Sequence, residues 1–292
     1  MRWLWLLAAC SSSPSTEPGW MAKASNDLSL AALSLPGTHD SGALYEAIPG
    51  SAKTQNLDID QQLGIGVRFL DIRLRNVSDA LAVYHGPESE MQTFDQVVAS
   101  VYAYLDKHPS ETVIMAVKEE YMAMDATMTF EQVFAGYVAK SPKHWYTDAS
   151  LPMLGAARGK IVLVRRFTAT SPLGIDASGW QDNTTFTLTT PAAVMRIEDA
   201  YMVASTDKKW SAITTALTAA RASTDTTLYI TYTSGYMSMN GIPNTPAVSN
   251  VIDPMMQTYL DDPAIIGAHL GIIAMDFVDE GHAAPIIGAN AL

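Results

Sequence analysis

The chain has 292 residues, of which 48% are hydrophobic and 16% are charged, and its formal net charge is −12. This length suits one large domain or two small ones, and the hydrophobic fraction is sufficient for a sizeable core. The negative field repels phosphate backbones, which excludes nucleic acid as a partner recruited by overall charge. An anionic substrate would need a local cluster of cations.

The first ten residues, MRWLWLLAAC, place one positive charge before an apolar run over residues 3–9. A positive start, an apolar run and small residues before a cleavage point are typical of an export signal. The ending LAAC resembles the lipobox of bacterial lipoproteins, in which the cysteine is lipidated. Cys10 is also the only cysteine, which excludes an internal disulfide. We expect an exported protein, either secreted or anchored to a bacterial membrane through Cys10, with a chance cysteine as the alternative.

The expected organisation is a leader and flexible linker over residues 1–20 and one domain over residues 21–292. Eight apolar or β-branched runs in this domain end in polar residues. They cover residues 28–35, 67–74, 80–86, 112–120, 160–167, 194–201, 228–235 and 271–278. Apolar residues at helical spacing predict helices over residues 93–109, 207–223 and 248–262, the last with Pro254 near its first turn.

This alternation predicts an α/β fold of the (β/α)8 barrel, or TIM, type. Near-continuous apolar strands fit a parallel sheet that is buried on both faces, and about 250 residues is the usual size of such a barrel. The link from Arg73 to Ala80 is too short for a helix, so we expect an irregularity there. An open doubly wound sheet is the alternative, and the absence of a G-x-G-x-x-G loop after the first strand counts against it.

Polar residues follow the predicted strands at the ends where a barrel carries its active site. They comprise two imidazoles, several carboxylates and several cations. In chain order they are His39, Asp40, Asp71, Arg73, His85, Lys118, Arg165 or Arg166, Asp199, Tyr201 and Asp276. Each alone has a structural explanation, such as a cap or a solvated strand end. Their convergence on one face predicts an acid–base site.

Seven segments resemble, in order, the X domain of bacterial phosphatidylinositol-specific phospholipase C. They are LSLPGTHDSG, GVRFLDIRLR, AVYHG, HPSETVIMAVKEEY, RGKIVLVRRF, RIEDAY and IIAMDF. The resemblance extends from about Asn26 to about Val278. It implies a distorted, incompletely closed barrel and a lyase-type cleavage of phosphatidylinositol to diacylglycerol and inositol 1,2-cyclic phosphate, without a cofactor.

The resemblance also implies catalytic roles. His39 matches the family's general base and His85 its general acid, and an imidazole suits both tasks because its pKa lies near operating pH. Asp276 and Asp40 match the carboxylates that support the base and the acid. Arg73 would bind the phosphoryl oxygens, for which a planar, permanently charged fork is better than lysine.

The remaining matches concern the headgroup and the metal. Asp71 is expected beside Arg73. The inositol-contacting positions are Lys118, Arg166, Asp199 and Tyr201, with Arg165 as the alternative to Arg166. Calcium-dependent relatives carry carboxylates where this chain has Arg73 and Lys118, so we expect metal independence. A calcium-dependent phosphodiesterase and a non-catalytic barrel that binds inositol lipids are the alternatives.

The substrate's acyl chains lie in a bilayer, so the barrel rim must dock on lipid. Two segments, residues 43–52 and 233–246, carry apolar side chains in Gly- and Pro-containing loops. The docking candidates are Leu44, Ile48, Tyr236, Met237, Met239 and Ile242. We expect shallow insertion of these tips, because overall charge does not attract the protein to anionic lipid. Phosphatidylinositol in membranes is the expected partner, and we expect a monomer.

Overall fold

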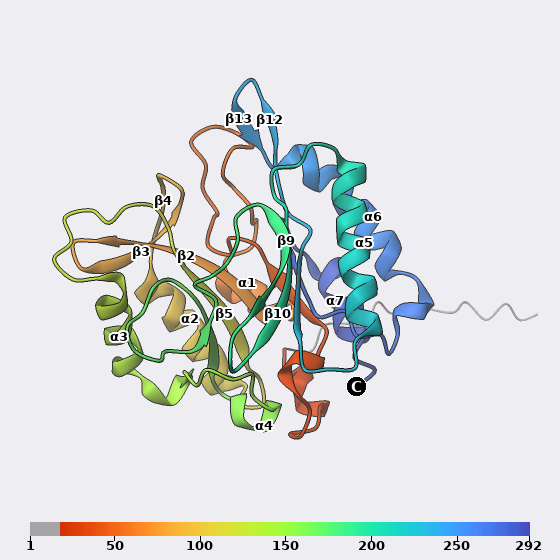
Figure 1. Ribbon diagram of the computed structural model, residues 1–292, viewed down its shortest axis with the longest axis horizontal. Coiled ribbons are helices and arrows are strands. Elements are labelled where there is room, and N and C mark those ends of the chain that lie inside the picture. The colour runs from red at the N-terminus through yellow and green to blue at the C-terminus, as the bar shows by residue number, and fades with distance from the viewer. Residues whose placement is uncertain (1–17) are drawn as a thin grey trace, which may run out of the picture.

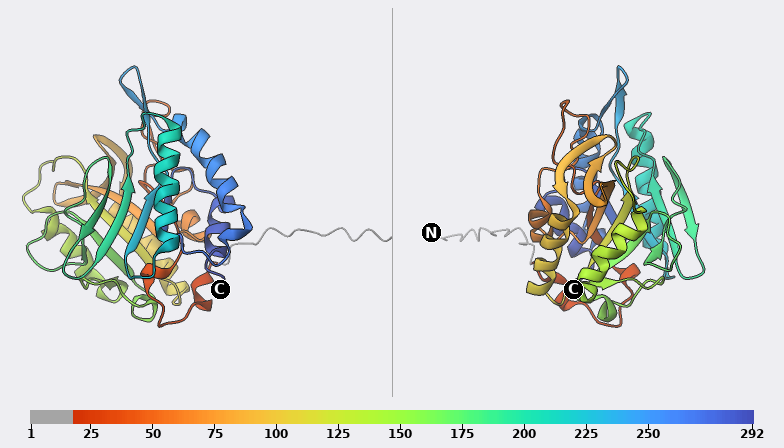
Figure 2. Two further views of the ribbon diagram at one scale, coloured as in Figure 1. Left: turned by 45° about the vertical axis from the view of Figure 1, so that its right-hand side comes forward. Right: turned by 90° about the vertical axis from the view of Figure 1, so that its left-hand side faces the viewer.

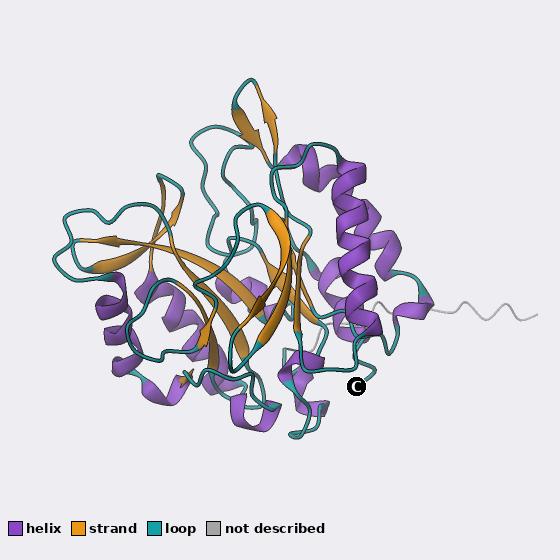
Figure 3. Ribbon diagram, viewed as in Figure 1, coloured by secondary structure: helices purple, strands orange, loops and turns teal. Residues whose placement is uncertain are grey.

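A curled sheet with helices on its outer face forms the body of the protein (Figures 1 and 3). The structure, a computed structural model, describes residues 18–292, so Cys10 and most of the predicted leader lie outside the described residues. The strand order is β6 (Trp145–Tyr146), β7 (Ile161–Arg166), β5 (Val113–Glu119), β2 (Phe69–Val77), β1 (Leu35–Thr38), β14 (Ile272–Met275), β11 (Leu228–Tyr232), β10 (Val194–Asp199) and β9 (Thr184–Thr189). All neighbours in this order are parallel except β10 and β9.

The barrel is incompletely closed, as predicted. In residues 18–292 the end strands β6 and β9 do not pair with each other, and the short β8 (Ile175–Asp176) pairs with β7. The edge strand β9, which runs antiparallel to β10, was not predicted. Its alternation of buried and exposed residues occurs in a Thr-rich segment with few apolar side chains, so the sequence signal is weak.

Seven α-helices are present in the described part of the chain. They are α1 (Ile59–Gly64), α2 (Phe94–Lys107), α3 (Phe130–Lys140), α4 (Leu154–Ala157), α5 (Thr206–Ala222), α6 (Pro246–Leu260) and α7 (Glu280–Gly288). In Figure 1 α2 and α3 flank one side of the sheet, and α5, α6 and α7 flank the other. Within residues 18–292, no helix has the length and apolar character needed to cross a bilayer.

Both faces of the sheet are buried, which explains the near-continuous apolar strands. Residues that alternate along each strand enter two separate cores. On β2, Phe69 points into the barrel, whereas Leu70 and Ile72 face the helices. The same alternation on β14 separates Ile272 from Ile273.

Two of the predicted helices are confirmed with small boundary shifts, and the third differs in one respect. Thr93 and Gln96 form the capping box that begins α2. Helix α6 begins at Pro246, so Pro254 lies inside the helix, and its predicted place near the first turn is wrong. The side chain of Asn244 caps the first turn of α6 by accepting a hydrogen bond from the Ala247 amide.

The break in the alternation after β2 is a hairpin. Strand β3 (Ala80–His85) pairs antiparallel with β2 and with β4 (Glu88–Thr93), so it is not a barrel strand. Ser78 and Asp79 both have positive φ, 51° and 61°, which is the geometry of a two-residue hairpin turn. The first predicted run also differs, because a 3-10 turn over Leu30–Ala32 precedes the strand.

The N-terminal segment packs against the end of the barrel opposite the β12–β13 hairpin (Met237–Met239 and Ile242–Asn244; Figure 2). Buried Arg68 pairs with Glu111 and donates to the Pro18 carbonyl. Trp20 is only 3% exposed. The folded body therefore begins slightly earlier than the predicted boundary at residue 21.

Candidate active site

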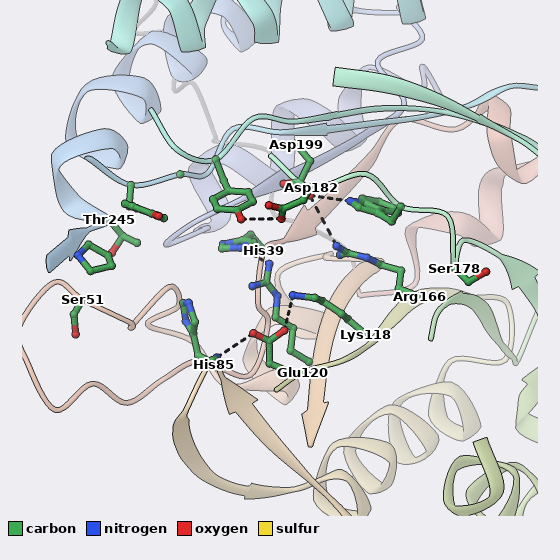
Figure 4. Close-up of a pocket in the computed structure, with 17 residues that line it drawn as sticks. His39, Ser51, His85, Lys118, Glu120, Arg166, Ser178, Asp182, Asp199 and Thr245 are labelled. Atoms are coloured by element: carbon green, nitrogen blue, oxygen red, sulfur yellow. Dashed lines mark hydrogen bonds and ion pairs between the residues drawn. The ribbon is translucent and has the colours of Figure 1, made fainter. Parts of the chain in front are cut away.

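The polar ends of the parallel strands surround one pocket of about 360 Å³ (Figure 4). Seven of the ten predicted catalytic and headgroup residues line it. The other three, all of them aspartates, lie buried behind these seven. The lining includes His39, Arg73, His85, Lys118, Arg166, Asp199 and Tyr201. The buried carboxylates are Asp40, Asp71 and Asp276. Residues that are up to about 240 positions apart in sequence are brought together because parallel strands end at the same edge of a sheet.

His39 is held between a carboxylate and a guanidinium. Its Nδ1 lies 2.7 Å from Oδ1 of Asp276, and its Nε2 lies 2.8 Å from Nη2 of Arg73. A guanidinium can only donate hydrogen bonds, so Nε2 must accept. The proton of the neutral ring therefore lies on Nδ1 and is donated to Asp276. This tautomer presents the Nε2 lone pair to the pocket.

The backbone around His39 is fixed by neighbouring strands. Thr38 at the end of β1 is in register with Met275 at the end of β14, so the next residues, His39 and Asp276, lie side by side. The Gln55 amide donates to the carbonyl oxygens of both His39 and Met275, at 2.8 and 2.9 Å. The chain turns sharply at Asp40, whose φ is 38°. These contacts hold the imidazole and the carboxylate in one geometry.

The second imidazole, His85 on β3, also has a carboxylate partner. Its Nδ1 lies 3.3 Å from Oδ2 of Asp40 and 2.8 Å from the Ala52 carbonyl oxygen. Burial raises the pKa of Asp40 to about 7. Burial, together with the positive charge of Arg73, lowers the pKa of His85 to about 4. In the free site the pair therefore favours a neutral imidazole and a protonated Asp40.

Arg73 connects the two imidazole–carboxylate pairs. Its Nε lies 3.7 Å from Oδ2 of Asp40, and its Nη2 reaches both His39 and, at 3.3 Å, Oδ2 of Asp71. Burial works to raise the pKa of Asp71, but Arg73 and Arg166 outweigh it and lower the pKa to about 2. Asp71 is therefore ionised and keeps the guanidinium at the centre of the pocket.

The pocket wall across from the two histidines carries aromatic rings and carboxylates. The Arg166 guanidinium lies 3.9 Å above the Trp180 ring, and Trp180 donates from Nε1 to Asp199 at 2.9 Å. The Tyr201 hydroxyl donates to Asp182 at 2.8 Å. Burial and the nearby Asp182 carboxylate raise the pKa of Tyr201 to about 12, so the hydroxyl stays protonated. This wall offers donors, acceptors and an aromatic face.

Comparisons with known proteins agree with this geometry. The family model described as phosphatidylinositol-specific phospholipase C, X domain, matches residues 40–167. The 1-phosphatidylinositol phosphodiesterase of Staphylococcus aureus (strain Newman) is 34% identical over 235 residues, which cover 75% of this chain and 74% of that protein. The protein of the same name from Listeria monocytogenes serovar 1/2a (strain ATCC BAA-679 / EGD-e) is 30% identical over 94% of this chain and 86% of its own length. The chain belongs to the bacterial phosphatidylinositol-specific phospholipase C family.

Solved structures of the family share the fold. A structure of the phosphatidylinositol-specific phospholipase C from Staphylococcus aureus superposes with a TM-score of 0.84 at 28% identity, covering 95% of this chain and 99% of that one. The enzyme from Listeria monocytogenes gives a TM-score of 0.77 at 25% identity, covering 94% and 98%. The distorted, open barrel predicted from the sequence is therefore the fold of this family.

The open choice between Arg165 and Arg166 is decided by strand alternation. Arg165 points away from the pocket, where it pairs with Asp176 at 2.9 Å and donates to the Leu173 carbonyl. Arg166 points into the pocket (Figure 4), and its Nη1 lies 3.2 Å from Oδ1 of Asp71. The geometry therefore selects Arg166 as the pocket residue.

Several lining residues were not predicted. Glu120 pairs with Lys118 at 2.6 Å and accepts from the Gly86 amide at 3.0 Å. Burial opposes ionisation of Glu120, but Arg73 and Lys118 outweigh it and lower its pKa. The period of two along β5 could have indicated Glu120. The others lie outside the predicted strand ends, in loops except for Pro243 on β13; they are Ser51, Gly86, Ser178, Trp180, Asp182, Gly235, Pro243 and Thr245.

The predicted docking residues divide into three groups. Ile48, Met239 and Ile242 are exposed at the rim, by 49%, 56% and 43%. Leu44 is half-buried, and Met237 packs partly against the core outside the sheet. Tyr236 lines the pocket, where its ring lies 6.0 Å from that of Tyr201. Tyr236 is thus better placed to contact a headgroup than a lipid tail.

Proposed function

We propose that this protein is a metal-independent phosphatidylinositol-specific phospholipase C that forms diacylglycerol and inositol 1,2-cyclic phosphate. One observation carries the proposal: a single guanidinium, Arg73, lies between two imidazole–carboxylate pairs. The pairs are His39 with Asp276 and His85 with Asp40. An in-line displacement at phosphorus needs a base on one side, an acid on the other and positive charge between them.

The base step follows from the tautomer of His39. A bound phosphodiester competes for Arg73, and the guanidinium then donates to the phosphoryl oxygens instead of to Nε2. The freed Nε2 lone pair takes the proton of the inositol 2-hydroxyl, and that oxygen attacks phosphorus. Asp276, 2.7 Å from Nδ1, stabilises the imidazolium that forms.

The acid step uses the proton held by the His85–Asp40 pair. In the free site, burial and the Arg73 charge favour neutral His85 and protonated Asp40. The phosphodiester charge offsets that of Arg73, which favours an imidazolium, with Nδ1–H beside an ionised Asp40 and the second proton on Nε2. His85 then protonates the glycerol oxygen as its bond to phosphorus breaks. Water opens the cyclic ester slowly when the two imidazoles exchange roles.

The headgroup wall supports inositol as the alcohol part of the substrate. Arg166, Lys118 and Asp199 offer a mixture of charged donors and acceptors for ring hydroxyls, and Tyr201 offers an aromatic face. A headgroup that carries a 4- or 5-phosphate would bring negative charge near Asp199 and Asp182. We therefore propose that such phosphoinositides are poor substrates, which a comparison of turnover in matched vesicles tests.

Metal independence is supported by the chemistry of the pocket. In residues 18–292 no cluster of three or more His, Cys, Asp or Glu side chains has the arrangement of a metal site. Arg73 lies between Asp40 and Asp71, where a calcium ion would need oxygen ligands on all sides. A guanidinium at this point repels a cation and supplies positive charge itself. The calcium-dependent alternative predicts that chelation abolishes turnover and that added calcium restores it.

We propose that the exposed rim side chains insert shallowly into the lipid surface. Met239 and Ile242 lie on the β12–β13 hairpin, which projects from the fold in both views of Figure 2. Exchange of both residues for Ser should weaken vesicle binding and spare hydrolysis of soluble inositol cyclic phosphate. Ile266→Ser is a matched control, because Ile266 is 72% exposed and precedes the start of β14, at the other end of the strands. Unchanged vesicle binding by the double variant would contradict the docking role.

Export and the monomeric state are also proposals. The order of charge, apolar run and small residues before Cys10 supports export, with release or lipid anchoring as the two outcomes. Palmitate labelling of the wild type but not of Cys10→Ser would support anchoring, and unlabelled protein in the medium would support release. The proposed base, acid and guanidinium all belong to one chain, so the proposed mechanism needs no second subunit, and we propose a monomer. Light scattering at assay concentration tests this.

Phosphorus NMR of the products from phosphatidylinositol vesicles, with and without chelator, tests the function directly. A cyclic phosphate signal in both samples is the expected result. Chelator-sensitive formation of a linear phosphate would favour the calcium-dependent alternative. His39→Ala separates an enzyme from a binding module, because an enzyme loses turnover by about 10³-fold or more whereas a binder keeps its ligand.

A further inference from the structure

The segment over residues 44–53 surrounds the proposed acid without forming a helix or strand. It leads from the turn after β1 towards α1 and passes His85, whose Nδ1 lies 2.8 Å from the Ala52 carbonyl oxygen. A carbonyl can only accept a hydrogen bond, so this contact keeps a proton on Nδ1. The other ring nitrogen, Nε2, is then the atom that exchanges a proton with the substrate. The position of Ala52 thus sets both the orientation and the tautomer of His85.

Thr245 attaches this segment to the β12–β13 hairpin and α6. The Thr245 amide donates to the Gly50 carbonyl at 3.0 Å, and its hydroxyl lies 3.2 Å from the Gly50 carbonyl and 3.3 Å from that of Lys53. Gly50 and Lys53 are on either side of Ala52. Thr245 is buried and, like Ser51 and His85, lines the pocket (Figure 4).

The segment is held at two further points. The Tyr45 amide donates to Oε2 of Glu90 on β4 at 2.8 Å. Within the segment, Oε2 of Glu46 accepts from the amides of Ala52 and Lys53, at 3.4 and 3.2 Å. These bonds fix the amide side of the Ala52 peptide, whereas Thr245 fixes the carbonyls on either side of it. Loss of the Thr245 hydroxyl removes one of the bonds that fix the Ala52 carbonyl relative to His85.

We propose that Thr245 is a positioning residue for the acid step, acting through Gly50, Ala52 and Lys53 on His85. The inference rests on the proposed function, because it takes His85 as the group that protonates the leaving oxygen. A displacement of a catalytic group by about 1 Å can reduce turnover by about 10²-fold. The Thr245 hydroxyl shares one proton between the Gly50 and Lys53 carbonyls, in addition to the bond from the Thr245 amide to Gly50. We therefore expect loss of that hydroxyl to reduce kcat by about tenfold, with KM changed by less than about twofold.

Three variants test this inference. Thr245→Val removes the hydroxyl at constant shape, and Thr245→Ser restores it without the methyl group. Thr258→Val is the matched control, because Thr258 also donates its hydroxyl to a carbonyl, that of Pro254 at 2.9 Å, on the same helix but at an exposed position. Turnover of phosphatidylinositol in vesicles should fall only for Thr245→Val, and the Ser variant should restore it. Unfolding midpoints report whether each variant folds.

A second substrate separates positioning from a merely structural role. An inositol phosphodiester with a phenolate leaving group departs without protonation and does not need the acid. Thr245→Val should cleave it at the wild-type rate. The alkaline limb of the kcat–pH profile for phosphatidylinositol should also shift to lower pH, because the Ala52 bond raises the pKa of His85.

Equal losses on both substrates, or no loss on either, would overturn the inference. Failure of Thr245→Ser to restore turnover would also do so. Thr245→Ala repeats the test in a smaller side chain if the Val variant does not fold. A wild-type protein that does not cleave phosphatidylinositol would instead refute the proposed function, so the two failures are distinguishable.

Discussion

The pairing of His39 with Asp276 gives the sharpest prediction for catalysis. Asp276→Asn preserves the shape of the side chain but replaces the acceptor that faces Nδ1 by a group that can donate. If the amide donates to Nδ1, the ring proton moves to Nε2, where it points at Arg73 and no longer leaves a lone pair for the substrate. The variant thus loses the charge that stabilises the imidazolium and also loses the correct tautomer.

The distance of 2.7 Å between His39 and Asp276 sets an upper bound on the stabilisation of the imidazolium that Asp276→Asn removes. With an effective dielectric constant of about 20, two unit charges at this distance attract by about 6 kcal/mol. The net value of a charge-assisted hydrogen bond, about 1.5–3 kcal/mol, sets the lower bound. Since about 1.4 kcal/mol corresponds to a factor of ten, these bounds predict that kcat falls between about 10-fold and 10⁴-fold. We expect about 10³-fold, with little change in KM.

The assay is initial-rate cleavage of phosphatidylinositol in vesicles of fixed composition, with kcat and KM measured separately. Asp279→Asn is a matched control, because Asp279 lies 2.8 Å from Nδ1 of His282 in an exposed Asp–His pair outside the pocket. The control should retain wild-type kcat. Retention of kcat within about threefold by Asp276→Asn would refute the assignment of His39 as the base.

Three further predictions follow from the same pocket. Chelator should leave the initial rate unchanged, and calcium added afterwards should not raise it. Arg73→Lys should reduce kcat by about 10²-fold or more, as measured on vesicles, because an ammonium lacks the planar fork that donates to two phosphoryl oxygens at once. Burial raises the pKa of Asp40 to about 7, so the fold favours its protonated form and loses stability as pH rises through this value. Asp40→Asn should therefore raise the unfolding midpoint near pH 8, by more than near pH 5, while turnover falls.

The sequence was most informative at the ends of the parallel strands. The catalytic candidates on β1, β2, β7, β10 and β14 follow apolar runs directly, and a parallel sheet brings such ends to one edge regardless of their separation in the chain. The family resemblance then supplied roles that a strand pattern cannot supply. Strand alternation left one ambiguity, Arg165 or Arg166, because a one-residue change of register exchanges the two faces. The pairing of β7 with β5 settles that register.

The sequence was least informative where loops contribute to the site. Trp180 and Asp182 follow β8, a strand of two residues, and come from a segment without apolar periodicity. Their position depends on contacts with Arg166, Asp199 and Tyr201, which are distant in the chain. Thr245 was missed for the same reason, since its partners in residues 50–53 are almost 200 positions away. Such tertiary contacts leave no local pattern that a single sequence could reveal.

The hydrogen bonding of the first catalytic turn explains how the fold maintains so many charges in one pocket. The turn's own polar groups are satisfied by neutral side chains: Ser41 donates to the Thr38 carbonyl and accepts from the Asp71 amide, and Gln62 donates to the Ser41 carbonyl. By contrast, among the described residues neither carboxylate oxygen of fully buried Asp40 has a well-formed hydrogen bond. An unsatisfied buried carboxylate destabilises a fold unless it is protonated or paired.

The hydrogen bonds of Ser41 and Gln62 therefore hold the turn in place although the Asp40 carboxylate within it lacks a hydrogen-bond partner among residues 18–292 of the free protein. The charges of Asp40, Arg73 and His85 are balanced only when an anionic group lies among them, because such a group accepts from Arg73 and favours an imidazolium beside an ionised Asp40. The electrostatic cost of the empty pocket is thus relieved on binding of a phosphodiester. Relief that is complete when the substrate binds raises affinity, whereas the part that grows with the negative charge on the phosphoryl oxygens during attack lowers the barrier.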